Sequence, residues 1–131
     1  PMHQFLSIPL TLRWLITLAF VALIVVLSVT PGKSQYGDTM FVWLIEHTPT
    51  LVQKLMHLVC YAAMTALFAW SLETIESLTG RLLLSLVLAM ALGASLEWFQ
   101  INIPGRFGTL MDVILNSIGA VLGLLVAMIL L

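Results

Sequence analysis

Four polar or charged side chains interrupt the otherwise apolar C-terminal half of the chain. Glu97 lies near the end of one apolar segment, Arg106 follows it, and Asp112 and Asn116 lie at the start of the next segment. Such groups are costly inside a bilayer and usually mark a functional site. Carboxylates, an arginine and an amide can together transfer protons or bind an anionic group.

A second apolar segment carries polar residues at helical spacing. Lys54, His57 and Tyr61 follow the pattern i, i+3, i+7, which places them on one stripe of a helix. An imidazole can both accept and donate a proton, so His57 is the natural proton-transfer group of this stripe. We therefore expect this segment to contribute to the same site.

Glycines and an amide extend the polar stripes. Gly93, Glu97 and Gln100 share one helix face, with Gly93 one turn deeper than the carboxylate. The pair Gly119 and Gly123 continues the face that carries Asn116, and small residues at this spacing let two membrane helices approach closely. This pattern predicts tight packing of the last helix against a neighbour.

The composition indicates an integral membrane protein. The chain has 131 residues, of which 61% are hydrophobic and 8% are charged, and its mean hydropathy is +1.12. Because a helix needs about 20 residues to cross a bilayer, we predict an all-α membrane protein, a bundle of four transmembrane helices with short loops and both termini on one side. The single transmembrane domain covers 1–131, with spans at about 10–29, 50–72, 82–101 and 110–131.

Local signals place the ends of these spans. Pro31 closes the first span, and the charged segment 73–81 forms the turn before the third. Thr109 and Asp112 have the spacing of a capping box and open the fourth span. Arg13 lies close enough to the end of the first span for its head group to reach the membrane surface.

Charge and cysteine content exclude two classes of function. A net charge of -1 excludes the basic surface of a nucleic-acid-binding protein, and the single Cys60 excludes a disulfide framework.

The membrane orientation is predicted from the positive-inside rule. We weigh Arg13 and Arg81 on the side of the termini against Lys33 on the other side, which favours cytoplasmic termini.

The predicted topology brings the polar stripes together. The second span begins at the membrane face where the third ends and the fourth begins, because consecutive spans alternate in direction. Two cations, Lys54 and Arg106, then balance two carboxylates, Glu97 and Asp112, beside His57. Balanced charge is much less costly to bury than unpaired charge.

The motifs in these three spans resemble those of the VanZ-like family of small integral membrane proteins. The motifs, in chain order, are Q-K-x-x-H from Gln53, E-x-x-Q from Glu97, P-G-R ending at Arg106, and D-x-x-x-N-x-x-G from Asp112. Members commonly have an acidic residue where this chain has Gln53. The resemblance implies a multi-pass protein of the bacterial cytoplasmic (inner) membrane. Through the founding member, it also implies a link to teicoplanin resistance and the cell envelope.

We therefore expect a site that binds or acts on an anionic, lipid-linked cell-envelope component at the outer face. His57 and Glu97 are the candidate catalytic acid and base. The candidate substrate-binding residues are Lys54, Arg106, Gln100, Asp112 and Asn116. Membrane lipids or a lipid-linked envelope precursor are the expected partners, with no nucleic acid, and a membrane-protein partner or homo-oligomer is compatible with the sequence. Whether the chain is an enzyme stays open.

The cluster and its residues have three other interpretations. The cluster can be a purely structural ion-pair network in a non-enzymatic scaffold or accessory subunit of an envelope protein. Asp112 can be a capping residue at a positive helix end. A metal site of His57, Glu97 and Asp112 is disfavoured because Lys54 and Arg106 compete for the carboxylates, so we predict no metal and no cofactor.

Overall fold

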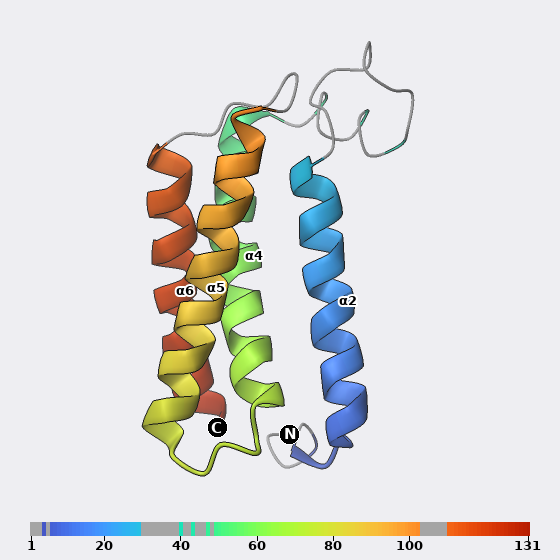
Figure 1. Cartoon of the computed structure of the whole chain (residues 1–131), viewed down its shortest axis with the longest axis vertical. Helices are drawn as coiled ribbons and strands as arrows, with labels where there is room; N and C mark the ends of the chain where they lie inside the picture. Colours follow the sequence, from blue (N-terminus) through green and yellow to red (C-terminus); the bar gives the residue numbers. More distant parts are fainter. Residues whose placement is uncertain are drawn as a thin grey trace.

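The computed structural model describes residues 4, 6–29, 40, 43, 47, 49–102 and 110–131. The long elements of this described part are four helices, with no strand, which Figure 1 labels α2 (Leu10–Val29), α4 (Thr50–Ser71), α5 (Leu78–Gln100) and α6 (Leu110–Leu130). Each is long and apolar enough to cross a membrane. The predicted all-α class with four membrane-spanning helices is confirmed.

The third span starts earlier than predicted, at Leu78 rather than 82. Ser77 stands at the N-cap, and its side-chain oxygen accepts a hydrogen bond from the backbone N–H of Gly80 at 3.2 Å. This bond satisfies one of the N–H groups that a helix start leaves without a partner. Arg81 consequently belongs to α5 and not to the turn before it.

Several residues that mark predicted helix ends lie outside the described residues. They are Pro31, Pro104, Gly105 and Thr109. The capping-box prediction that pairs Thr109 with Asp112 therefore stays a prediction, although Asp112 does lie in the first turn of α6.

The four helices form an up-and-down bundle (Figure 1). The N-terminal end of α2 and the C-terminal end of α6 lie at the same end of this bundle. α4 contacts all three other long helices, and its contact with α6 is the most extensive in the bundle. The polar residues of α4 therefore have neighbours on several sides.

Two glycines of α6 make the close contact with α4 possible. A Cβ atom added to Gly119 would lie 2.5 Å from the carbonyl oxygen of Leu58, and one added to Gly123 would lie 2.8 Å from Cα of Ala62. Backbone therefore packs directly on backbone at both positions, as the small-residue spacing predicted. Dispersion contacts of this kind stabilise helix pairs in lipid, where the hydrophobic effect between helices is absent.

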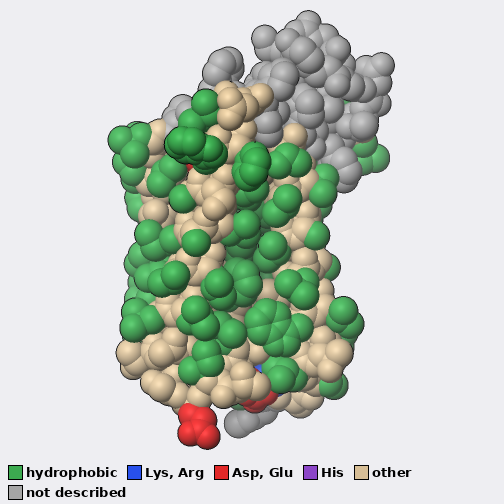
Figure 2. All heavy atoms as spheres, in the orientation of Figure 1, with side chains coloured by type: hydrophobic (Ala, Val, Ile, Leu, Met, Phe, Trp, Pro, Cys, Tyr) green, Lys and Arg blue, Asp and Glu red, His purple; other side chains and the backbone are tan. Residues whose placement is uncertain are grey.

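The interior of the bundle is small and the outer surface is apolar. The main buried cluster contains Ile24 from α2, Tyr61, Met64 and Phe68 from α4, and Leu96 from α5. Large apolar side chains remain exposed along every long helix. Figure 2 shows them covering the flank of the bundle, with acidic side chains at one end. This distribution suits a protein whose flank contacts lipid rather than water.

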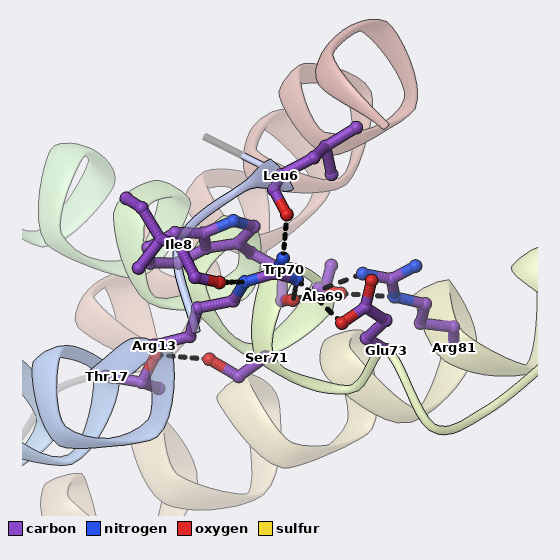
Figure 3. A network of polar contacts seen from close by, with 9 residues as sticks. All are labelled: Leu6, Ile8, Arg13, Thr17, Ala69, Trp70, Ser71, Glu73 and Arg81. Atoms are coloured by element: carbon purple, nitrogen blue, oxygen red, sulfur yellow. Dashed lines mark hydrogen bonds and ion pairs between the residues drawn. The ribbon is translucent and has the colours of Figure 1, made fainter. Parts of the chain in front are cut away.

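A buried arginine joins α2 to the C-terminal end of α4, shown in Figure 3. Only 1% of Arg13 is exposed. Its guanidinium donates hydrogen bonds to the backbone carbonyls of Leu6, Ile8 and Trp70. It also forms an ion pair with Glu73 at 3.2 Å and lies 5.4 Å from the ring centroid of Trp70. The prediction that Arg13 extends to the membrane surface is wrong, because protein carbonyls replace water around it.

A second arginine and two hydroxyl groups complete this network (Figure 3). Arg81 donates to the carbonyls of Ala69 and Trp70, which lie in the last turn of α4 and have no partner within the helix. The hydroxyl groups of Thr17 and Ser71 are 2.7 Å apart and hydrogen-bonded. Positive charge at a helix C-terminus is favourable, so the network caps α4 and attaches α2 to it.

Candidate functional site

The candidate site lies at the opposite end of the bundle, where α4 and α6 begin and α5 ends (Figure 1). Each helix contributes polar side chains near that terminus: His57 from α4, Glu97 from α5, and Asp112 and Asn116 from α6. The alternating direction of the helices brings these termini together, as the sequence predicted. We call these four residues the polar cluster.

His57 and Asn116 are joined directly. Nδ1 of His57 and Oδ1 of Asn116 are 2.6 Å apart, and since the amide oxygen can only accept, the imidazole Nδ1–H donates. This bond links α4 to α6 and fixes the orientation of the ring. The remaining nitrogen, Nε2, then carries the lone pair that can accept a proton or bind a cation.

The two carboxylates lie beside this pair. Three side chains, those of His57, Glu97 and Asp112, each offer one atom that could bind a metal ion. These three atoms lie within 4.8 Å of one another. Glu97 is 5% exposed, whereas His57 and Asp112 are half-buried. Glu97 and Asp112 each also take part in a further polar or electrostatic interaction. The cluster therefore has a buried side at Glu97 and a more open side at the other two residues.

Gly93 leaves room for the side chains of Tyr61 and Asn116 beside the polar cluster. A Cβ atom added to Gly93 would lie 2.8 Å from a ring carbon of Tyr61 and 3.2 Å from the amide nitrogen of Asn116. The ring of Tyr61 lies nearly parallel to that of His57, with centroids 6.3 Å apart and an interplanar angle of 4°. Tyr61 and Gly93 thus position the His57–Asn116 pair from below.

Gln100 and Lys54 occupy places different from those expected for them. Gln100 is buried, and its side-chain N–H donates to the backbone carbonyl of Ser28 at 3.1 Å. It therefore attaches α5 to the end of α2 and does not orient the cluster through that bond. Lys54 is exposed, and no hydrogen bond or ion pair joins it to another described residue. Arg106 lies outside the described residues.

The polar network that the sequence analysis missed is the one around Arg13. Arg13 and Thr17 are spaced i, i+4 in an apolar helix, and this spacing indicates a buried polar face on α2. Their partners Ser71 and Glu73 lie at a helix end far away in the sequence, so the pairing itself has no local signal. The described part of the chain thus has a polar group at each end of the bundle.

The polar cluster can support two kinds of chemistry. His57 and Glu97 provide a base and an acid close together, the combination needed for proton transfer to or from a bound substrate. The ring nitrogen and two carboxylates also form a compact set of ligands for a cation. Both uses depend on the same convergence of three helices.

Comparisons with known proteins agree with this architecture. The sequence profile of the VanZ/LLP1 family matches residues 10–131, which includes all four long helices. No curated protein and no solved structure matches the chain significantly. With nearly its whole length matched, and with four helices able to span a bilayer, this membrane protein belongs to the VanZ/LLP1 family.

Proposed function

We propose that the polar cluster binds an anionic, lipid-linked component of the bacterial cell envelope at the outer face of the cytoplasmic membrane. The observation that carries the proposal is the convergence of His57, Glu97 and Asp112 from three helices at one end of the bundle. Ionisable groups inside membrane segments are rare and are usually retained for function. Their position at the helix ends suits a ligand whose head group lies at the membrane surface.

The residues have different roles in the proposed site. Lys54 is exposed at this end of α4 and, together with Arg106, supplies the positive charge that a phosphate group requires. His57 and Glu97 form the acid and base pair if the bound component reacts. Asn116 orients His57 through their hydrogen bond, and Asp112 completes the cluster. Gln100 supports the site indirectly by holding α5 against α2.

Membership of the family supports an extension of the proposal to glycopeptide sensitivity. The founding member of the family is linked to teicoplanin resistance and hence to the cell envelope. A protein that binds a lipid-linked envelope component in the outer leaflet can change how much of that component is accessible there. We therefore expect expression of the chain to change teicoplanin sensitivity.

Single substitutions test the proposal. Glu97→Gln and His57→Ala should abolish the change in teicoplanin sensitivity and weaken binding of a polyprenyl phosphate, measured by native mass spectrometry of the full chain. Glu76→Gln is the matched control, because Glu76 is exposed in the connection between α4 and α5, at the other end of the bundle. Membrane accumulation must be equal in all variants. Unchanged binding and unchanged sensitivity in both cluster variants would exclude the proposed function.

A second candidate function, a non-enzymatic scaffold or accessory subunit, is favoured by the network at the opposite end. Arg13 is buried there and its donors are directed to backbone carbonyls and Glu73, so this chain does use buried charge to hold helices together. The scaffold function predicts that Glu97→Gln lowers the amount of folded protein and that an envelope protein co-purifies with the chain. Retention of the fold with loss of lipid binding would reject it.

A further inference from the structure

We infer that His57, Glu97 and Asp112 form a binding site for a divalent metal ion. The site has one nitrogen and two oxygen ligands, contributed by α4, α5 and α6 respectively. This ligand set suits Zn²⁺ or Mn²⁺, since imidazole favours zinc and later transition metals while carboxylates accept manganese.

The distances are close to those that a metal requires. The three potential ligand atoms lie within 4.8 Å of one another. A metal with bonds of about 2.1 Å and tetrahedral angles separates its ligands by about 3.4 Å. The ligand atoms must therefore approach one another by roughly 1.4 Å, which small rotations of the two carboxylate side chains can provide.

Asn116 prepares His57 for this role. Histidine ligands in metal sites usually donate their second ring N–H to a neighbouring oxygen, which fixes the tautomer and the direction of the ring. In this protein the Nδ1–H of His57 donates to Oδ1 of Asn116 at 2.6 Å. Nε2 is thereby left with the lone pair that a metal ion binds. Asn116 is 3% exposed, so water competes little for this bond.

The burial pattern leaves room for an exchangeable ligand. Glu97 closes the interior side of the site, while His57 and Asp112 are only half-buried. Three protein ligands and an open side are typical of metal sites that bind a further molecule. That open side is where water or a phosphate oxygen would complete the coordination.

Charge also favours a cation here. Glu97 and Asp112 bring two negative charges into one cluster, and these would repel an anionic head group. The expectation of no metal depended on competition from Lys54 and Arg106. Lys54, however, is exposed and forms no ion pair with the described residues. A divalent ion would offset the repulsion and bind the phosphate. This last role rests on the proposed function.

The test is metal binding by the full chain in lipid nanodiscs, after treatment with a chelator and without added ligand. Titration with Zn²⁺, Mn²⁺ and Mg²⁺, followed by calorimetry and elemental analysis, should show a single saturable site that prefers Zn²⁺ or Mn²⁺ to Mg²⁺. Absence of a saturable site would overturn the inference.

Variants separate the site from adventitious binding. Glu97→Gln and Asp112→Asn should each abolish saturable binding, and Asn116→Ala should weaken it by about 10- to 100-fold. His47→Ala is the matched control, because His47 is exposed, stacks on Trp43 and is not one of the three ligand residues. Wild-type helicity by circular dichroism is required of every variant. Loss of binding in His47→Ala, or its retention in both carboxylate variants, would contradict the site.

The two proposals can fail independently. Metal binding is measured in nanodiscs without polyprenyl phosphate, and polyprenyl phosphate binding is measured with and without the chelator. A saturable metal site without lipid binding supports the inference and rejects the proposed function. Lipid binding that persists in chelator, with no metal site, supports the function and rejects the inference.

Discussion

Two buried charged residues of this chain have very different surroundings. The hydrogen bonds of Arg13 go to backbone carbonyls and its ion-pair partner is Glu73, so its bonds hold the chain in one arrangement. Glu97 lies within reach of two other titratable side chains, His57 and Asp112. Titratable side chains can take up and release protons, whereas backbone carbonyls cannot. Burial of a charge therefore does not identify a site until its partners are known.

This difference predicts that Arg13 is important for stability. Arg13→Ala removes the side-chain donor to the carbonyls of Leu6 and Ile8 and one of the two arginine donors to that of Trp70. A buried carbonyl left without a donor costs about 1–3 kcal/mol. Arg13→Lys should recover only part of the loss, because an ammonium cannot reach several carbonyls with a planar fork. Unfolding by sodium dodecyl sulfate in mixed micelles, followed by circular dichroism, measures these changes.

The control for Arg13 is its ion-pair partner. Half of the side chain of Glu73 is exposed, so Glu73→Gln should change the free energy of unfolding by less than about 1 kcal/mol. Equal losses in Arg13→Ala and Glu73→Gln would show that the ion pair, and not the bonds to carbonyls, accounts for the stabilisation.

At the scale of helices, the contact between α4 and α6 sets the geometry of the polar cluster. Gly119 and Gly123 let the backbone of α6 rest on Leu58 and Ala62 of α4. Asn116 lies one turn from Gly119 on α6 and reaches His57, which precedes Leu58 on α4. The helix separation that the glycines allow is thus the separation that the His57–Asn116 bond needs.

Replacement of Gly123 by alanine should separate the two helices. The added Cβ would lie 2.8 Å from Cα of Ala62, and overpacking of this kind costs about 1–3 kcal/mol. Gly80→Ala is the matched control, since its added Cβ would meet its nearest atom at 3.6 Å and alanine favours a helix by up to about 1 kcal/mol. The same unfolding titration compares them. A loss for Gly80→Ala equal to that for Gly123→Ala would contradict the packing argument.

At the scale of the whole molecule, the bundle places its two polar groups at opposite ends. The Arg13 network lies at the end where α4 leads into α5, and the polar cluster lies at the end where α5 stops and α6 starts (Figure 1). An apolar flank separates them (Figure 2). If the termini are cytoplasmic, as the arginine and lysine distribution predicts, the polar cluster faces the outside of the cell.

Cysteine labelling in intact cells tests this orientation. In a Cys60→Ala background, Asn102→Cys and Glu76→Cys place exposed thiols at the two ends of the bundle. A membrane-impermeant maleimide should label Asn102→Cys, and should label Glu76→Cys only after the cells are permeabilised. The reverse pattern would place the polar cluster at the cytoplasmic face and contradict an outer-leaflet substrate.

Much of the fold and part of the site could be predicted from the sequence. Long apolar runs of about 20 residues specify helices that cross a bilayer, because lipid leaves the backbone no other way to satisfy its hydrogen bonds. Helical spacing and alternating direction then predicted that His57, Glu97, Asp112 and Asn116 would meet. These predictions depend on the helix period and on chain connectivity, which are local properties.

Only the tertiary structure decided the partners of each side chain. Lys54 points in nearly the same direction as Tyr61 but lies about 10 Å nearer the start of α4. No described helix covers it there, so Lys54 is exposed whereas Tyr61 is buried. Gln100 shares a stripe with Glu97 yet bonds to Ser28, and Arg13 contacts Trp70 and Glu73 at the end of α4. Spacing sets the direction of a side chain along its own helix. What lies in that direction depends on the rotation and extent of neighbouring helices, which contacts distant in the sequence determine.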